Sequence, residues 1–553
     1  MEHLNQHTSR HQRPPSWQPM AFALVLVLGI FMGYQQRGED GSLGFSADRG
    51  RVVHILDRIE QLYVDPVMRE DLEAAAVEAI LDELDPHSMY FSEEELAAMA
   101  EPMTGNFEGI GVEFILQDDT LMVVAAIPGG PAEKMGIRAG DRILTVDSME
   151  ISGPELTNRK VMKWLKGPRN TTVVVGLDRP DGVVEIGLRR DRIPIHSVVA
   201  ALPIHEDVGY IKVIRFAQNT AEEFEEGMEA LAAAGMQHVI VDLRGNGGGY
   251  LNAVVPMVES FLSEDEVVVY TEGVHAPRRT YRALGDGRWK HWGLTVLVDE
   301  SSASASEIFA GAIQDNDRGF VVGRRTFGKG LVQEEFDVSG QGALRLTVAR
   351  FHTPTGRAIQ KPYGGAINYE DDYFARYERG ELFNADSIKV VDSLKYVTPQ
   401  GRMVHGGGGI VPDFFVPMDT SSWTSYLRDI SWSGLLRDGA FSFVDRERAA
   451  LEILQSPSDF TTNIEERAVT YLLEEAALSG MEPPSLTDGE LHVLTHRFMA
   501  QVARNVFGES AYHGYLAEED KVVDEAIQWL QSAQDLEVIN GRLTLPSKPR
   551  SEN

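Results

Sequence analysis

Past residue 50, apolar side chains recur every three or four positions, the spacing of one face of an α-helix. Two such runs follow each other, separated by a short polar break. They predict two amphipathic helices, built on Val53, Leu56, Ile59 and Leu62, and on Leu72, Ala76, Ile80 and Leu84. We expect these helices to form a small helical domain over residues 51–105.

The pattern changes at Asn106 to short apolar runs separated by glycine and proline. Runs such as GIGVEFIL, LMVVAAI and TTVVVGL are typical of short strands with tight turns, and predict a small β barrel or sandwich over residues 106–192. Within this region, GGPAEKMGIRAGDRIL combines a helix start, a glycine stop and a strand in the order found in PDZ domains, which the region resembles.

The PDZ resemblance implies a peptide-binding loop made of Gly109, Ile110 and Gly111. Its backbone N–H groups would bind the carboxylate of a peptide that adds as a strand to the sheet edge. A structural β domain without a ligand is the alternative.

Strand and helix patterns alternate over residues 193–417. The runs HVIVDL and LTVLVD are apolar on both faces, as strands between two helix layers must be. This alternation predicts an α/β core. Helical patterns such as ERAALEIL and KVVDEAIQWLQSAQDL then predict a helical C-terminal domain over residues 418–553, whose role in oligomer contact, partner docking or gating stays open.

The first 50 residues contain an uncharged apolar run, PMAFALVLVLGIFMGY, that follows Arg10 and Arg13. A helix of this length would rise about 24 Å, slightly less than a bilayer core, so an export signal and a membrane anchor are both consistent with it. No small-residue cleavage site follows, which favours an anchor in the inner membrane with the rest of the chain outside the cytoplasm. A secreted or periplasmic protein is the alternative.

Composition excludes several classes of function. The net charge of −33 argues against a nucleic-acid partner, because phosphate binding needs a basic surface. The chain has no cysteine, which excludes thiol catalysis, disulfides and thiolate metal sites. No H-E-x-x-H motif is present, so we expect neither a metal nor another cofactor.

Two loops of the α/β core come directly after a strand and before a helix, where open α/β sheets place their chemistry. The loop RGNGGG, residues 244–249, has glycines that let the backbone approach a ligand and present N–H groups to a negative charge. The second loop, SSASAS, leads into the helix EIFAGAIQ. Ser304 and Glu307 have the spacing of a helix-capping box, a role compatible with a reactive serine at the same position.

A serine nucleophile needs a base, and Lys329 in the turn TFGKG is one candidate. Two other interpretations are a solvated turn residue and a phosphate-binding loop, although Gly330 stands where that loop needs Ser or Thr. His352 and His405 are alternative bases for a Ser-His site. A lysine acts as a base only when neutral, so we expect Lys329 to be buried near Ser304 with no carboxylate touching its amine.

Taken together, SASASEIFAGAIQD, TFGKGLVQ, DLRGNGGG, TPTGRAIQ and GGIVPD resemble the carboxyl-terminal processing peptidases, also called tail-specific proteases. The resemblance covers about residues 51–417. It implies a crotonase-like α/β peptidase core with an inserted PDZ domain, and a serine peptidase that needs no cofactor. The catalytic pair implied is Ser304 and Lys329, with Ser302 and Ser306 as neighbours.

The resemblance also implies supporting roles. Gln333 would orient the lysine amine, and the N–H of Ala305 with that of Gly248 or Gly249 would form the oxyanion hole. Further family positions, expected to shape the site, are Glu307, Asp315 and Thr326. The implied partners are exported proteins or peptides with free C-termini, and the chain itself in a homo-oligomer. A catalytically silent PDZ scaffold is the alternative function.

Overall fold

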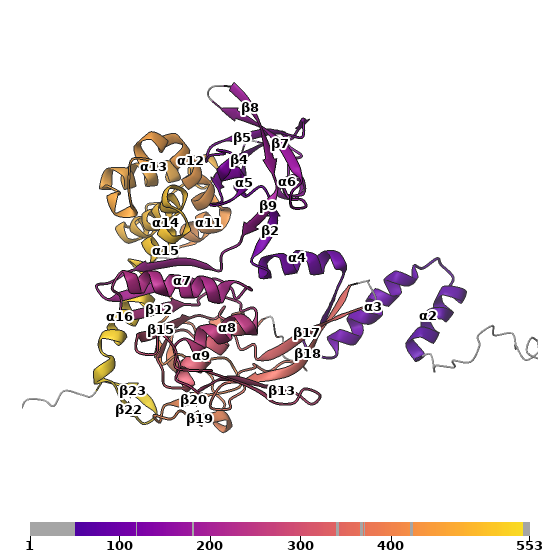
Figure 1. Ribbon diagram of the computed structural model, residues 1–553, viewed down its shortest axis with the longest axis vertical. Helices are drawn as coiled ribbons and strands as arrows, with labels where there is room; N and C mark the ends of the chain where they lie inside the picture. The colour runs from indigo at the N-terminus through magenta and orange to yellow at the C-terminus, as the bar shows by residue number, and fades with distance from the viewer. Residues whose placement is uncertain are drawn as a thin grey trace, which may run out of the picture. The chain divides into compact units, whose positions relative to one another are not determined.

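The computed structural model describes residues 50–545, apart from residues 118, 180–181, 339–341, 365–368, 370 and 421–423 (Figure 1). The chain divides into two compact units, Met1–Ile80 and Leu81–Asn553. The predicted anchor over residues 19–34 lies outside the described residues. In the part of the chain that is described, no helix is both long and apolar enough to cross a bilayer.

The two predicted N-terminal helices are present as α2 (Arg51–Leu62) and α3 (Arg69–Asp82). The predicted apolar face of α2 is only partly covered, because Leu56 is buried whereas Leu62 is 72% exposed. Arg69 at the start of α3 forms ion pairs with Asp57 and Glu60 of α2. The helical spacing was therefore predicted correctly, but it does not report how much of the face is buried.

The β domain expected after Asn106 contains one main sheet with the strand order β3-β4-β5-β7-β8. The main-sheet strands are β3 (Val112–Gln117), β4 (Thr120–Ala126), β5 (Arg142–Val146), β7 (Thr172–Arg179) and β8 (Gly182–Arg189), with β6 (Met149–Glu150) paired to β5. Two helices, α5 (Pro131–Lys134) and α6 (Asn158–Leu165), complete it, and β2 (Asn106–Gly109) pairs with β9 (Asp191–Pro194) at its entry and exit. Strand β3 lies at the edge of the sheet, where a peptide strand can be added.

The α/β core is built on a six-stranded sheet with the order β10-β11-β12-β15-β16-β21. Its strands are β10 (Val198–Pro203), β11 (Val208–Val213), β12 (His238–Asp242), β15 (Gly293–Val298), β16 (Phe320–Gly323) and β21 (Phe414–Phe415). All neighbours from β11 onward pair in parallel, and only β10 is antiparallel. The carboxyl ends of β12 and β15, which carry the two predicted loops, therefore lie side by side.

Alternate residues of these strands enter two different hydrophobic layers, because successive side chains point to opposite faces of a sheet. Val239 and Val241 of β12 pack with the helices α7 (Thr220–Ala233), α8 (Leu251–Glu259) and α9 (Ala305–Asp315), which lie together in Figure 1. Ile240, between them, packs with α16 (Lys521–Gln531) on the other face. The C-terminal helix thus completes a three-layer core, although the sequence-based boundary places it in a separate domain.

A second sheet lies beside the core, with the order β1-β18-β13-β14 and β17 added to β18. Its strands are β1 (Met89–Phe91), β13 (Val267–Glu272), β14 (Arg279–Arg282), β17 (Leu331–Asp337) and β18 (Ala343–His352). The helix α4 (Glu93–Met103) follows β1 and begins at a capping box formed by Ser92 and Glu95. The segment after β18 contains α10 (Asp372–Glu378), the short 3₁₀ helices η1 (Ala385–Ser387) and η2 (Asp392–Leu394), and the hairpin β19 (Lys395–Val397) and β20 (Met403–His405).

The predicted C-terminal helices are present and share a hydrophobic core of their own. They are α11 (Ser425–Ser433), α12 (Leu435–Leu451), α13 (Thr462–Leu478), α14 (Asp488–Phe507) and α15 (Glu509–Ala517), with η3 (Pro457–Asp459) before α13. After α16, η4 (Ala533–Asp535) leads to the hairpin β22 (Glu537–Ile539) and β23 (Arg542–Thr544).

The carboxylate of Asp242 anchors the carboxyl end of β12 and should be important for stability. Asp242 is 1% exposed and accepts hydrogen bonds from Arg244, Lys212 and the Tyr210 hydroxyl. Burial alone would raise its pKa, but the positive charges of Arg244 and Lys212 hold the pKa far below its usual range. Removing one partner of a buried ion pair costs about 3–5 kcal/mol, so we expect Asp242→Asn to lower the unfolding free energy by that amount near neutral pH. Asp392→Ala, which removes an exposed pair with Lys395, should leave the unfolding free energy nearly unchanged in the same denaturant titration.

The pH dependence follows from the depressed pKa of Asp242. Its stabilising contribution is present above the unfolded-state pKa of about 3.9 and is lost as the pH falls further. The stability difference between wild type and Asp242→Asn should therefore shrink in acid. A difference that stays constant from neutral to acidic pH would contradict this assignment.

Candidate active site

Ser304 lies at the turn between β15 and α9, directly before the first residue of the helix. Its backbone has φ 55° and ψ −110°, a conformation that a residue with a side chain rarely adopts and that costs about 1–3 kcal/mol. The neighbouring serines hold this turn in place, because Ser302 Oγ donates to Leu243 O at 2.9 Å and Ser306 Oγ donates to Asn246 O at 2.8 Å. Ser304 is the half-buried serine between two fully buried ones.

The Glu307 carboxylate connects the serine turn to the lysine turn. Its Oε2 accepts the backbone N–H of Ser304 at 2.9 Å and that of Lys329 at 2.8 Å. Its Oε1 accepts the N–H of Gly328 at 2.8 Å and the hydroxyl of Thr326 at 2.5 Å. Burial raises the pKa of this fully buried carboxyl, and the four hydrogen bonds limit the rise. One side chain therefore fixes the backbone at both members of the predicted Ser-Lys pair.

Lys329 is half-buried, and its amine donates to Gln333 Oε1 at 3.3 Å. Among the described residues its amine forms no ion pair with a carboxylate and no hydrogen bond with Ser304 Oγ. Burial lowers the pKa of Lys329, and nearby Arg345 acts in the same direction, whereas Asp85 and Glu307 act against it. Desolvation, the main cause, thus shifts the pKa of Lys329 in the direction that a lysine base requires.

One glycine of the loop after β12, Gly248, lies against the start of α9, and its neighbour Gly249 lies against Phe216. A Cβ on Gly248 would come within 2.7 Å of the Ser304 Cβ and 2.9 Å of the Ala305 nitrogen, and its φ of 100° also favours glycine. The Gly248 N–H donates to Asn246 Oδ1 at 2.8 Å. Within the described part of the chain, the N–H groups of Ala305 and Gly249 have no protein acceptor. Of the two glycines left open by sequence, Gly249 is therefore the one whose N–H is available.

The remaining two family positions act at a distance from the serine. Thr326 Oγ1 accepts the N–H of Ile410 at 2.7 Å while it donates to Glu307, so it links the lysine turn to the GGIVPD segment. Asp315, at the last turn of α9, pairs with the fully buried Arg357 at 2.6 Å and accepts the Thr355 hydroxyl. Both contacts hold the loops around the site and agree with a structural role.

Neither histidine proposed as an alternative base lies next to the serine by any described contact. His352 stacks on Tyr270 with ring centroids 4.7 Å apart, and His405 lies in strand β20. The histidine that does approach the pair is His87, whose backbone oxygen accepts Gln333 Nε2 and whose pKa burial and Lys329 lower to about 4. Sequence reasoning missed His87 and Asn246. His87 follows an Asp-Pro pair, which signals only a turn, and Asn246 lies in a glycine-rich loop, which signals only close backbone approach.

The PDZ loop predicted to bind a carboxylate lies between β2 and β3. Its carbonyl groups point into the domain, because Ile110 O accepts the N–H of Ala132 and Gly111 O accepts that of Ile127, each at 2.9 Å. Gly109, Ile110 and Gly111 are all buried, and the loop leads directly into the edge strand β3. The position suits a peptide terminus entering beside β3.

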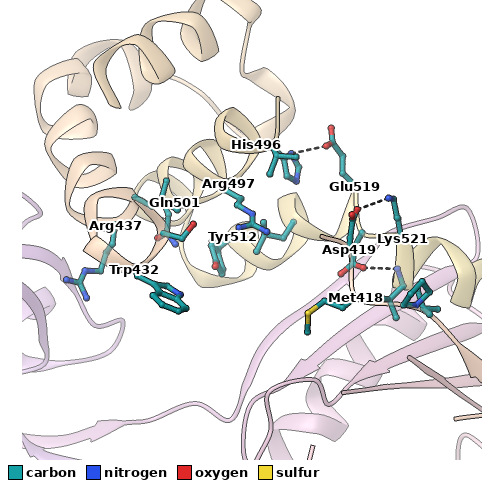
Figure 2. A pocket seen from close by; sticks show the side chains of 18 of the residues that line it. Met418, Asp419, Trp432, Arg437, His496, Arg497, Gln501, Tyr512, Glu519 and Lys521 are labelled. Atoms are coloured by element: carbon teal, nitrogen blue, oxygen red, sulfur yellow. Dashed lines mark hydrogen bonds and ion pairs between the residues drawn. The ribbon is translucent and has the colours of Figure 1, made fainter. Parts of the chain in front are cut away.

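A cavity of about 820 Å³ lies elsewhere, between the C-terminal helices and the segment around Met418 (Figure 2). Its lining includes Trp432, Arg437, His496, Arg497, Tyr512 and Lys521, and none of the predicted catalytic residues. Lys521 pairs with Asp419 at 2.6 Å at its edge. This cavity therefore does not coincide with the predicted catalytic residues.

Comparison with known proteins identifies the family. Residues 207–368 match peptidase family S41, and residues 122–179 match a PDZ domain. The chain is 30% identical over 318 residues to the carboxy-terminal processing protease CtpB of Bacillus subtilis, covering 55% of this chain and 66% of that protein. It is 33% identical over 314 residues to a carboxy-terminal-processing protease of Bartonella bacilliformis, covering 55% and 71%.

A solved structure of a photosystem II D1 C-terminal processing protease covers 56% of this chain and 89% of that chain, with 29% identity and a TM-score of 0.33. The chain spans about two thirds of the length of the Bacillus relative. The two regions match in the order that the sequence motifs predict. The chain therefore belongs to peptidase family S41: it is a serine-type peptidase with a PDZ domain, related to the carboxy-terminal processing proteases.

Proposed function

We propose that this protein is a serine endopeptidase that uses Ser304 as nucleophile and Lys329 as general base to cleave exported proteins recognised by their C-termini. The observation that carries the proposal is the Glu307 carboxylate, which accepts the N–H groups of both residues through one oxygen. A shared acceptor keeps two turns that are 25 positions apart in sequence in a fixed relation. A surface turn lysine would need no such support.

The proposed reaction begins with a neutral Lys329 amine. It takes the proton of the Ser304 hydroxyl while Oγ attacks the scissile carbonyl, which forms a tetrahedral intermediate. The N–H groups of Ala305 and Gly249 stabilise the oxyanion at the N-terminus of α9, where the helix dipole adds to the effect. The lysine then gives its proton to the leaving amine, and returns as base when water hydrolyses the acyl-enzyme.

Gln333 orients the base in this proposal. Its Oε1 accepts the lysine amine, and its Nε2 donates to the backbone oxygen of His87, so the amide cannot turn without losing one of these bonds. The hydrogen bond to a neutral oxygen constrains the amine without the charge of a carboxylate. Such a partner is compatible with a lysine that must lose its proton.

Substrate selection is assigned to the PDZ domain. A peptide would pair with edge strand β3 and present its carboxylate to the N–H groups of the loop over Gly109, Ile110 and Gly111. We also propose that the protein is exported to the cell envelope, because residues 19–34 form an apolar run after two arginines. Such a run can serve as an inner-membrane anchor or as a signal for secretion.

Replacing either member of the pair should abolish cleavage and preserve binding. Ser304→Ala removes the nucleophile, and Lys329→Arg keeps a charge that cannot be lost at usable pH. We expect kcat to fall roughly 10³-fold or more for each, with peptide affinity within about twofold of wild type. Lys290→Arg, at an exposed pair with Asp286, is the matched control and should be fully active. Near wild-type cleavage by Lys329→Arg would show that the base is another residue.

Activity should depend on pH through the lysine. Because a base acts only when deprotonated, the rate should rise with pH through the depressed Lys329 pKa and fall in acid. Initial rates over a pH series, with enzyme stability checked at each pH, give the profile. A rate that peaks in acid would contradict a lysine base.

Cleavage should also depend on the substrate's own terminus. A peptide with an apolar free C-terminus should be cut faster than the same peptide amidated at that end, because the amide cannot supply the charge that the loop binds. The comparison measures kcat/KM for both peptides. Equal values would assign another purpose to the PDZ domain.

A further inference from the structure

The four-residue loop Asp85–Ser88, which we call the DPHS loop, follows α3 and precedes β1. It is closed on itself by the Asp85 carboxylate. Asp85 Oδ1 accepts the N–H of His87 at 2.9 Å and that of Ser88 at 3.1 Å, while Oδ2 accepts the Ser88 hydroxyl at 2.6 Å. Pro86 restricts the same turn. The loop therefore has a fixed backbone shape.

The DPHS loop is fixed to strand β18 beside the lysine. Thr347 donates its N–H to Ser88 Oγ at 3.2 Å and its hydroxyl to Asp85 Oδ1 at 3.1 Å. The following strand β1 continues the attachment, since Met89 pairs with Arg345. Through these bonds a segment more than 200 positions before Ser304 lies in the second sheet, where β17 carries Gln333.

His87 makes two separate contacts toward the lysine turn. Its backbone oxygen accepts Gln333 Nε2, the amide whose other end accepts the Lys329 amine. Its ring nitrogen Nε2 shares a 2.9 Å hydrogen bond with the Tyr369 hydroxyl, with the rings edge to face at 5.2 Å. Tyr369 in turn packs edge to face on Phe327, at 5.8 Å, two residues before Lys329. The rings of His87 and Tyr369 thus pack in series onto the residue that begins the lysine turn.

The charges around the lysine amine come from several elements. Arg345 on β18 is cationic, while Asp85 in the DPHS loop and Glu307 on α9 are anionic. A further cation, Lys361 in the loop after β18, acts on His87. Lys361 is held by Asp372 at 3.2 Å and lies over the rings of Phe327 and Tyr369. His87 itself is neutral above about pH 4, since burial and Lys329 lower its pKa. The histidine therefore adds an uncharged ring rather than a charge.

We propose that His87 is a positioning residue of the catalytic centre: its carbonyl holds Gln333, and its ring, paired with Tyr369, keeps water from the Lys329 amine. The inference rests on the proposed function, because it concerns the base of that reaction. His87 is not itself the base, since its Nε2 is bonded to Tyr369 and, among the described residues, it has no hydrogen bond with Ser304. The Asp85 carboxylate of the same loop has the opposite effect to burial, because its negative charge raises the pKa of Lys329.

The test is the pH profile of kcat for two variants of the loop. His87→Ala removes the ring and admits water, which favours the charged lysine, so the acid limb should move to higher pH. Each unit of displacement lowers the rate about tenfold on the acid side, with full recovery in alkaline buffer. Asp85→Asn removes a nearby negative charge, which by itself moves the limb to lower pH, but it also weakens the hydrogen bonds that close the loop; its displacement should therefore be smaller than that of His87→Ala. KM should stay within about twofold of wild type for both.

Further variants separate this role from general damage. Tyr369→Phe keeps the ring on Phe327 and removes only the hydroxyl that holds His87, so it should move the limb in the same direction as His87→Ala, by less. Tyr363→Phe, which removes a hydroxyl that bonds Arg350, is the matched control and should leave the profile unchanged. The titration of the Lys329 amine, followed by its labelling rate with an acylating reagent in Ser304→Ala, should show the same displacements without any turnover.

Two results would overturn the inference alone: a rate lost equally at every pH in His87→Ala, or an acid limb that stays in place in His87→Ala, with Lys329→Arg still inactive. Cleavage by Lys329→Arg would instead overturn the proposed function, and the inference with it. The three outcomes are distinguishable on the same substrate.

Discussion

A single buried carboxylate, that of Glu307, determines the geometry of the candidate active site. It has four hydrogen-bond donors on two turns and, among the described residues, no cation within ion-pair distance. Hydrogen bonds to a charged group contribute about 1.5–3 kcal/mol each, so the four together offset a large part of the cost of burying the charge. If the carboxylate were absent, three backbone N–H groups and a hydroxyl would be left without this acceptor.

The second constraint is that the lysine amine must be kept from water without being paired to an acid. The neutral groups nearby are the Gln333 amide, which accepts the amine, and the rings of His87 and Tyr369, which pack in series onto Phe327 of the lysine turn. The two nearby carboxylates accept hydrogen bonds from other groups. Glu307 accepts backbone N–H groups, and Asp85 accepts donors of its own loop. The same side chains that build the turns thus also influence the charge of Lys329.

These contacts depend on a large core, since the residues that meet at the site come from regions far apart in the chain. The parallel pairing of β12 with β15 brings the glycine-rich loop against the start of α9. The second sheet brings the DPHS loop to Gln333, and α16 covers the far face of the first sheet. Arg376 of α10 further fixes the lysine turn, because its guanidinium donates hydrogen bonds to the carbonyls of Thr326 and Phe327.

The sequence by itself determined the elements and the chemistry that are encoded locally. Helix spacing located α2 and α3, the both-sided apolar runs located β12 and β15, and the motifs around Ser304 and Lys329 pointed to the family. The capping spacing of Ser304 and Glu307 predicted the bond from the Ser304 N–H, because partners three residues apart meet within one helical turn.

Tertiary structure alone decided which distant groups meet. Nothing in the sequence near His87 marks it as a partner of Gln333, and nothing near Gly248 shows that the Asn246 side chain accepts its N–H. The packing of α16 on the core likewise has no local signal, because an amphipathic pattern records an apolar face and not the surface that covers it. Side-chain periodicity is a property of a few consecutive residues, whereas the pKa of a lysine and the free N–H of a glycine depend on the groups that the fold places around them.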